Sequence, residues 1–186
     1  MIDSYTYTDE QIVLIILNGD NEAYEEIIKR YENKLIRYIK YLVPKTDDAE
    51  DIVQTTFIKA YENLNNFKQE YKFSSWIYRI AHNEAINRLK KKYQETFFPD
   101  FDLISLSSKE TPETEYEKKE LASTLMKCLN MLPVKYRGVL TLYYLEDKQY
   151  EDISIILKIP KGTVATRINR AKAKLKEICI KYHIGG

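Results

Sequence analysis

Residues 147–176 read DKQYEDISIILKIPKGTVATRINRAKAKLK, and this stretch decides how the C-terminal part of the chain folds. A tight break over residues 158–160 divides it, and a strongly basic helix follows the break. Two short helices joined in this way form a helix-turn-helix. The first of them is predicted by four residues at helical spacing, Tyr150, Ile153, Ile156 and Leu157.

The second helix has one apolar stripe and one polar face. Apolar residues recur every three or four positions, which at about 100° per residue places them on one buried line. The stripe consists of Val164, Ile168, Ala171, Leu175 and Ile178. The residues that then point away from the core are Thr166, Asn169, Arg170 and Ala173.

This outward face has side chains that can read a DNA major groove. Arg170 can present a planar fork to guanine, Asn169 a bidentate amide to adenine, and Thr166 a hydroxyl and a methyl group to thymine. A solvated, lysine-rich face on the last helix of a bundle is the alternative interpretation. Cations placed for phosphate contacts flank the face, namely Lys161, Arg167, Lys172 and Lys174.

The charges of the 186-residue chain are segregated, although they nearly cancel to a net +1. Residues 1–66 hold 7 basic and 13 acidic side chains, and residues 67–93 hold 7 and 2. Residues 94–117 hold 1 and 7, and residues 118–186 hold 14 and 6. Because phosphate binding needs clustered cations rather than a high overall charge, the two basic blocks predict two nucleic-acid contacts.

Composition and motifs exclude several classes of protein. Cys128 and Cys179 lie far apart with no paired spacing, which argues against a zinc site or a disulfide framework. No apolar run reaches membrane-spanning length and the first residues are acidic, so we expect a cytoplasmic protein without a signal peptide. The chain lacks a Gly-rich phosphate loop, a metal-ligand cluster and a nucleophile beside a base. We therefore expect no cofactor, no metal, no small-molecule substrate and no enzymatic activity.

Three helices are predicted before residue 66. The first runs over about 9–17, and the second keeps an apolar stripe from residue 24 to residue 42. The third, over residues 48–64, has a mixed polar and apolar stripe opposite its core face, which we interpret as a protein-docking face. An exposed Ile in a polar stripe also occurs without function. This stripe consists of Asp51, Gln54, Thr55, Ile58 and Glu62.

Residues 67–93 interleave aromatic and basic side chains, a mixture suited to stacking on unpaired bases while neutralising backbone charge. The alternative is an aromatic core with a basic rim. The aromatic residues are Phe67, Tyr71, Phe73, Trp76 and Tyr78, and the cations include Lys68, Lys72, Arg79, Arg88 and Lys90 to Lys92.

Residues 94–117 lose helical periodicity and gain Pro, Ser, Thr and acidic residues, which predicts a linker. Two further helices, one ending before Pro133 and one over about 136–143, lead into the helix-turn-helix. We therefore predict an all-α chain with two small helical domains, 1–93 and 118–186, joined by an acidic linker.

Two segments of the chain resemble parts of one family, the extracytoplasmic-function (ECF) sigma factors of bacterial RNA polymerase. DAEDIVQTTFIKAYENL (48–64) followed by FSSWIYRIAHNEAINRLKKK (73–92) resembles domain two of that family. LPVKYRGVLTLYYLEDKQYEDISIILKIPKGTVATRINRAKAKLK (132–176) resembles its domain four. The resemblance implies a dissociable subunit that gives RNA polymerase its promoter specificity and catalyses nothing itself. Its partners would be core polymerase, through the clamp and the flap, promoter DNA and an anti-sigma factor.

The resemblance also implies roles for individual residues, and it would direct the acidic linker toward the path of the product RNA. Core-polymerase binding would fall to Asp51, Gln54, Thr55 and Ile58. The minus-ten element would be melted and bound by Tyr71, Trp76, Arg79, Asn83, Asn87, Arg88 and Lys91, with Asn83 and Asn87 near a flipped base. The minus-thirty-five element would be read as duplex by Lys161, Thr163, Thr166, Arg167, Asn169, Arg170 and Lys174.

The chain departs from the family pattern at three positions. Lys158 stands in the turn where the family usually has Gly, and a left-handed conformation there costs a non-glycine residue about 1 to 2 kcal/mol. Ala165 replaces a frequent basic residue, and Ser154 replaces a common Ala. We expect these changes to affect the promoter sequence more than the fold.

Two other functions stay open at this point. A stand-alone helix-turn-helix regulator would bind duplex DNA without polymerase, usually as a dimer, yet no dimerisation element is evident after Ile184. A helical adaptor that binds no DNA would leave both basic blocks unexplained.

Overall fold

A computed structural model describes residues 7–43, 48–95 and 116–181, and every regular element in these ranges is a helix. The predicted all-α fold is therefore confirmed for this part of the chain. The α-helices are α1 (Asp9–Leu17), α2 (Tyr24–Leu42), α3 (Ala49–Glu62), α4 (Phe73–Glu95), α5 (Tyr116–Met131), α6 (Val134–Leu140), α7 (Tyr150–Leu157) and α8 (Lys161–Lys181). Short 3-10 turns at Asn21–Ala23 and Leu64–Asn66 and a π turn at Thr141–Leu145 join them.

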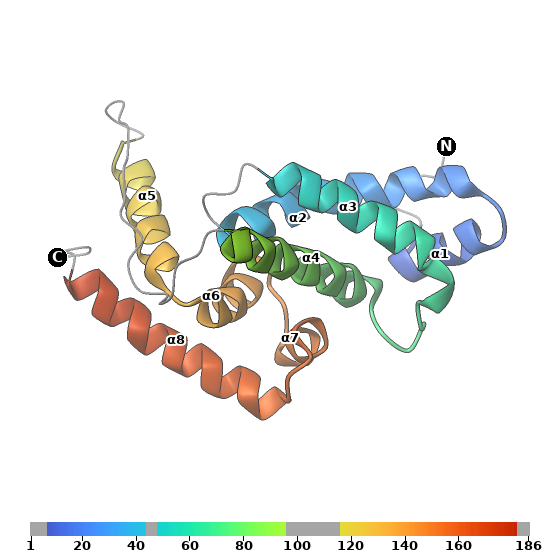
Figure 1. Cartoon of the computed structure of the whole chain (residues 1–186). Coiled ribbons are helices and arrows are strands. Elements are labelled where there is room, and N and C mark those ends of the chain that lie inside the picture. Colours follow the sequence, from blue (N-terminus) through green and yellow to red (C-terminus); the bar gives the residue numbers. More distant parts are fainter. Residues whose placement is uncertain (1–6, 44–47, 96–115, 182–186) are drawn as a thin grey trace.

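The first four helices form a bundle in which α3 packs against both α2 and α4 (Figure 1). The predicted helices over 9–17 and 24–42 are confirmed with these bounds. Thr8 and Gln11 begin α1 with a capping box, in which each side chain bonds the other residue's backbone N–H. The stripe of α2 is buried as expected, with Ile27, Leu35 and Tyr38 fully enclosed. Local sequence thus determines both the start of the bundle and its central helix.

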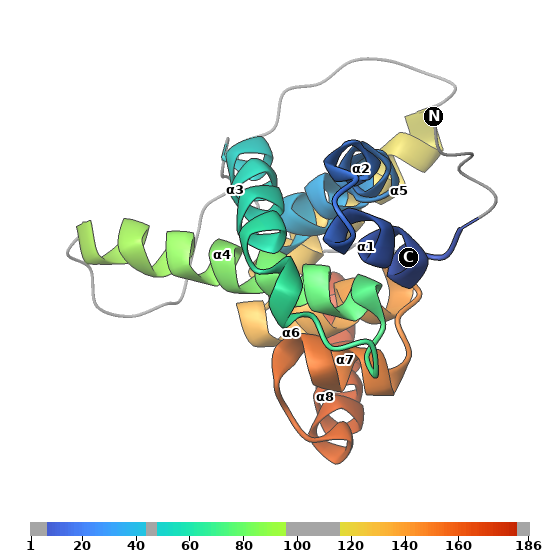
Figure 2. The same cartoon turned by 90° about the vertical axis from the view of Figure 1, so that its right-hand side faces the viewer.

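The remaining helices form the second unit, in which α8 packs against α5, α6 and α7. This unit contacts the first bundle along two lines. Helix α7 lies along α4, and α6 with the π turn after it lies against α2 (Figure 2). No sequence pattern predicts that the second unit packs on α2 and α4 in this way.

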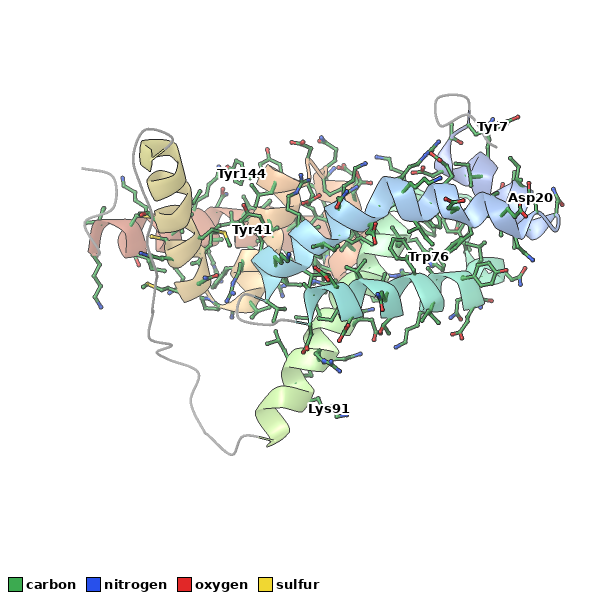
Figure 3. All side chains as sticks on the ribbon, turned by 90° about the horizontal axis from the view of Figure 1, so that it is seen from above. Tyr7, Asp20, Tyr41, Trp76, Lys91 and Tyr144 are labelled. Atoms are coloured by element: carbon green, nitrogen blue, oxygen red, sulfur yellow. The ribbon has the colours of Figure 1, made fainter. Side chains whose placement is uncertain are left out.

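The predicted linker 94–117 is only partly visible in the fold. Helix α4 continues to Glu95 and α5 begins at Tyr116, so the linker is helical at both ends, and the rest of it lies outside the described residues. The C-terminal turns of α4 extend past the other helices and carry Lys91 away from the bundle (Figure 3). Four side chains on this part of α4 are exposed, namely Asn87, Arg88, Lys90 and Lys91.

The two cysteines are closer in space than their positions in the sequence suggested. Both are free thiols, Cys128 on α5 and Cys179 on α8. Burial raises the pKa of the Cys128 thiol to about 12, and its contact with the Cys179 thiol acts in the same direction. Cys128 is therefore an inert core residue at neutral pH.

His82 lies where the two units meet. Its Nδ1 is 2.7 Å from the hydroxyl of Tyr38 on α2, and burial lowers its pKa from 6.5 to about 4. Gly138 of α6 lies over it, and a Cβ at this glycine would be 3.3 Å from Leu42 and 3.6 Å from the His82 ring. The glycine allows α6 to approach closely, and the imidazole is held neutral.

We expect His82 to make folding sensitive to mild acid. A pKa lowered in the folded state means that the unfolded chain binds more protons between about pH 6.5 and pH 4. The stability contributed by neutral His82 is complete above pH 6.5 and should fall by about 3 kcal/mol as the pH drops to 4. Denaturant unfolding of wild type and His82→Gln at both pH values measures this, since Gln can still accept from Tyr38. An equal loss of stability in both proteins would contradict the prediction.

Candidate nucleic-acid interface

The predicted helix-turn-helix is present as α7, a turn and α8. Val164, Ile168 and Ala171 of α8 are buried, and Leu175 and Ile178 pack against the same core with partial burial. Ile153 and Ile156 of α7 face them. The apolar stripe predicted from the spacing is confirmed, and it fixes which face of α8 is turned outward.

The turn between the two helices contains one strained residue. Lys158 adopts the left-handed conformation at φ 51° and ψ 47°, as expected for a position where glycine is usual. The Ser154 hydroxyl donates to the Ile159 carbonyl across the turn at 2.6 Å, and the Ile159 N–H donates back to the Ser154 carbonyl at 3.2 Å. An alanine at 154 could not form the first bond. The two departures at 154 and 158 therefore act in opposite directions on the stability of the turn.

The outward face of α8 lies opposite its buried stripe. Asn169, Arg170 and Lys174 are exposed and lie within about two turns of one another. Thr166 is exposed too, but its hydroxyl donates to the Gly162 carbonyl at 2.9 Å, so its methyl group is the more available part. Arg167 and Thr163 are half-buried at the edge of this face.

Two of the flanking cations have protein partners. Lys161 forms an ion pair with Glu151 of α7, and both side chains are largely exposed. Lys172 lies over the ring of Tyr144, with Nζ 5.4 Å from the ring centroid. An exposed ion pair contributes little stability, so Lys161 can exchange its partner for a phosphate at small cost.

The aromatic residues of 67–93 belong mostly to the core, which corrects part of the stacking prediction. Trp76 lies inside the bundle (Figure 3) and is 8% exposed. It packs on Phe67 and Phe73 at centroid distances of 5.5 and 5.6 Å. Little of its indole surface is therefore available to a base in this arrangement. Tyr78 is buried as well, whereas Tyr71 is 45% exposed. The alternative of an aromatic core with a basic rim therefore describes this segment, and Trp76 supports α4 from inside.

The rim of α4 forms a continuous ridge of polar side chains. Arg79, Asn83, Asn87 and Lys91 follow one another at intervals of four residues, which keeps them along one side of the helix. All but the half-buried Arg79 are exposed. Arg88 lies beside the ridge, with its Nε 3.0 Å from Asp48 and its Nη2 4.0 Å from Asp51. The structure thus aligns four of the residues expected at the minus-ten element.

A groove of about 480 Å³ separates α3 from the end of α4. The four residues expected at the polymerase line it from α3, and Asn87, Arg88 and Lys91 line it from α4. Of the four, Ile58 is 59% exposed and is a large apolar side chain in a polar setting. Two residue sets that were predicted for different partners therefore meet along one groove.

Sequence reasoning missed Glu84, which lines the same groove and pairs with Lys59 at 2.7 Å. It is one of two acidic residues among the seven cations of residues 67–93, and a lone carboxylate in a basic segment indicates a specific partner. Its pairing keeps Lys59 bound to α4, so α3 and α4 are joined at the edge of the groove.

Comparison with known proteins matches both units to one family. Residues 27–95 match the family model for Sigma-70 region 2, and residues 123–175 match the model for Sigma-70, region 4. The ECF RNA polymerase sigma factor SigW of Bacillus subtilis is 33% identical over 172 residues, which cover 87% of this chain and 91% of SigW. The chain belongs to the ECF sigma factors of the sigma-70 family. This sigma factor is also 34% identical over 175 residues to the RNA polymerase sigma-H factor of Pseudomonas aeruginosa, covering 88% of the chain and 90% of that relative.

Solved structures share the fold of this sigma factor. CnrH, in a complex with the cytosolic domain of CnrY, aligns with a TM-score of 0.68 at 22% identity over 96% of this chain and 99% of CnrH. The sigma factor RpoE from Bartonella quintana, in a complex with the anti-sigma factor NepR, aligns with a TM-score of 0.65 at 24% identity. The alignment covers 83% of this chain and 95% of RpoE. The predicted family, the two-domain helical fold and the role as a sigma subunit in promoter-specific transcription initiation are confirmed, and the regulator and adaptor alternatives are not needed.

Two further findings concern the described ranges. No group of three or more His, Cys, Asp or Glu side chains there is arranged to hold a metal ion. None of the helices in these ranges is both long enough and apolar enough to cross a membrane.

The turn of the helix-turn-helix can be tested by two substitutions with opposite effects. Lys158→Gly removes the left-handed strain and should raise the free energy of unfolding by about 0.5 to 1 kcal/mol, after the larger entropy of glycine in the unfolded chain is deducted. Ser154→Ala should lower it by about 1 kcal/mol through the lost hydrogen bond. Denaturant unfolding of the full chain measures both. Lys158→Ala is the matched control, because it keeps the Cβ and should leave stability nearly unchanged; stabilisation by alanine would refute the strain explanation.

Proposed function

We propose that three surfaces of this ECF sigma factor divide its work. The stripe of α3 binds the clamp of core RNA polymerase, the ridge of α4 binds the opened minus-ten element, and the outward face of α8 reads the minus-thirty-five element as duplex. The observation that carries this proposal is that α4 and α8 each have a buried stripe and, apart from it, a row of exposed polar side chains.

The α3 stripe has the composition of a protein contact. Ile58 lies at its centre with Asp51, Gln54 and Thr55 around it, so an apolar anchor has a polar rim. Because the groove continues onto α4, a polymerase element seated on α3 would lie next to the strand held by the ridge. Docking and strand binding would then stabilise each other.

The ridge of α4 suits a single strand better than a duplex. Opening a promoter costs a few kcal/mol for each base removed from its stack, which polar and stacking contacts with the protein must offset. Asn83 and Asn87 can bond the edges of an unpaired base, and Arg79 and Lys91 can neutralise phosphates on either side. Tyr71 is exposed before the start of α4 and can stack on a base.

The face of α8 reads duplex DNA through few base contacts. Arg170 and Asn169 are exposed at its centre, and Lys161, Arg167 and Lys174 surround them for phosphates. Ala165 is half-buried at a position where a further cation is frequent in the family. So small a set of base contacts suits a protein that binds its promoter together with polymerase rather than alone.

The broader assignment follows from these surfaces. We assign residues 1–93 to domain two, 94–117 to the linker and 118–186 to domain four. The protein acts in the cytoplasm and catalyses no reaction itself, since polymerase makes the RNA. An anti-sigma factor controls it; the fold shared with RpoE, which was solved bound to NepR, supports this part of the proposal.

Transcription in vitro tests the proposed function. Core RNA polymerase is combined with this protein on a library of genomic promoter fragments, and the initiated RNAs are sequenced. Discrete start sites preceded by a shared pair of elements would support the assignment. If core polymerase gains no promoter-selective initiation, the proposal is wrong.

The polymerase contact predicts a strong effect of charge at Ile58. Ile58→Glu should weaken binding to core polymerase at least about tenfold, because an apolar anchor at the centre of an interface is replaced by a carboxylate. Competition binding with labelled wild-type protein measures the affinity. The matched control is Ile180→Glu on α8, where an isoleucine is 64% exposed outside all three surfaces. Equal weakening by both variants would contradict the assignment of α3.

The duplex contact predicts different effects for two cations of α8. Arg170→Ala should weaken the free energy of promoter binding by about 1 to 3 kcal/mol, since a guanine contact is lost. It should also relax the sequence preference at one base pair. Lys174→Ala should weaken initiation at all promoters alike and reduce its salt dependence, as expected for a phosphate contact. Start-site sequencing with a randomised minus-thirty-five element separates the two. Loss of preference in the Lys174 variant alone would reverse these roles.

A further inference from the structure

Two acidic side chains of the C-terminal unit are buried against the N-terminal bundle. Glu146, at the end of the π turn, is 9% exposed, and Asp152, in the first turn of α7, is 6% exposed. The segments that carry them pack on the N-terminal bundle: α7 contacts α4, and the π turn contacts α2 (Figure 2). A carboxylate removed from water needs charged or hydrogen-bonding partners, and here the N-terminal bundle supplies them.

Glu146 is held by a fork and a hydroxyl. The guanidinium of Arg37 on α2 donates from Nε to Oε1 at 2.9 Å and from Nη2 to Oε2 at 3.0 Å. The hydroxyl of Tyr78 on α4 donates to Oε2 at 2.6 Å. Lys148 lies above the Tyr78 ring, with Nζ 4.5 Å from the ring centroid, and adds a positive charge near this group. Such a bidentate fork with an added hydroxyl is also the geometry that proteins use to bind a phosphate group.

Asp152 is held at the start of α4. The ammonium of Lys72 donates to its Oδ2 at 3.0 Å, and the hydroxyl of Ser75 donates to its Oδ1 at 3.1 Å. Lys72 precedes α4 by one residue, and at about 100° per residue it falls within about 40° of Arg79 and Asn83. Lys72, which is paired with Asp152, is therefore in line with the ridge that we assign to the minus-ten strand.

We propose that Glu146 and Asp152 stand in for nucleic-acid phosphates, and that they cover a backbone-binding site formed by Arg37, Lys72, Ser75 and Tyr78. In the closed arrangement described here, domain four occupies the first half of the strand-binding face of domain two. When the domains separate, both carboxylates return to water, and the buried Ser75 and Tyr78 are uncovered. The half-exposed Arg37 and Lys72 then lose their carboxylate partners and can pair with the phosphates of a DNA strand. The free sigma factor is thus self-inhibited, and polymerase or an opened strand has to displace its own acidic residues. This proposal rests on the proposed minus-ten role of α4.

Neutralising the two carboxylates tests the proposal. We expect the double variant Glu146→Gln, Asp152→Asn to bind a fluorescein-labelled oligo-dT of about 15 nucleotides about tenfold to a hundredfold more tightly than wild type in fluorescence anisotropy. This range corresponds to releasing a binding-competent form that is populated at roughly 1–10%. Small-angle X-ray scattering of the same protein should show a larger radius of gyration. The control Glu22→Gln, Glu32→Gln makes the same change in net charge at exposed acidic residues of domain two.

A second double variant places its changes in domain two, so that its result does not depend on altered side chains in domain four. Arg37→Glu with Lys72→Glu repels the same carboxylates from the other side, so the domains should open while affinity for oligo-dT does not rise. Adding Arg37→Ala and Lys72→Ala to the neutralised variant should remove most of its gain. Unfolding scans verify that each variant is folded.

The outcomes separate this inference from the proposed function. Unchanged affinity in the neutralised variant, or an equal gain in the Glu22 and Glu32 control, would overturn the inference. If wild type directs promoter-selective transcription while either of these results is obtained, only the inference fails. If neither wild type nor the opened variant directs such transcription, the proposed function fails.

Discussion

A buried carboxylate has to be paired, and this constraint fixes how the two halves of the molecule meet. Glu146 can leave water only where Arg37 and Tyr78 converge, and Asp152 only where Lys72 and Ser75 do. Because these donors come from both α2 and the start of α4, satisfying them sets the position of α7 along α4. The position of α6 over α2, and the close approach of Gly138 to His82, follow from the same placement. Polar pairing thus specifies an arrangement that apolar packing alone would leave less restricted.

Helix α4 is the element on which most of the molecule converges. One face carries aromatic rings into the core, while on another side the start of the helix contacts α7 and the polar ridge follows after it. Its end lines the groove shared with α3. The packed part of the helix is held rigidly, and for the proposed strand contact such preorganisation would lower the entropy lost on binding. The buried Trp76 packs on Phe67 and Phe73 and so helps to hold this helix in place.

The helix-turn-helix shows how one departure from a family pattern can be accommodated by another. Lys158 takes a left-handed conformation that favours glycine, and Ser154 supplies a hydrogen bond across the same turn. A side-chain hydrogen bond thereby braces a turn in which Lys158 is strained. The outward face of α8 is therefore positioned without the usual glycine.

The sequence by itself determined the helices, their buried stripes and the outward face of α8, because these depend on residue spacing within one helix. The periods of α2 and α8 placed Leu35 and Ile168 in the core, and paired motifs in a fixed order indicated the family. Only the tertiary structure decided that Trp76 is core, since a ring at helical spacing does not reveal which neighbours enclose it. It also brought Asp51 and Lys91 to one groove and paired Asp152 with Lys72, contacts that join residues far apart in the chain. Such pairings depend on how whole helices pack, and no local pattern of charge or hydrophobicity specifies that.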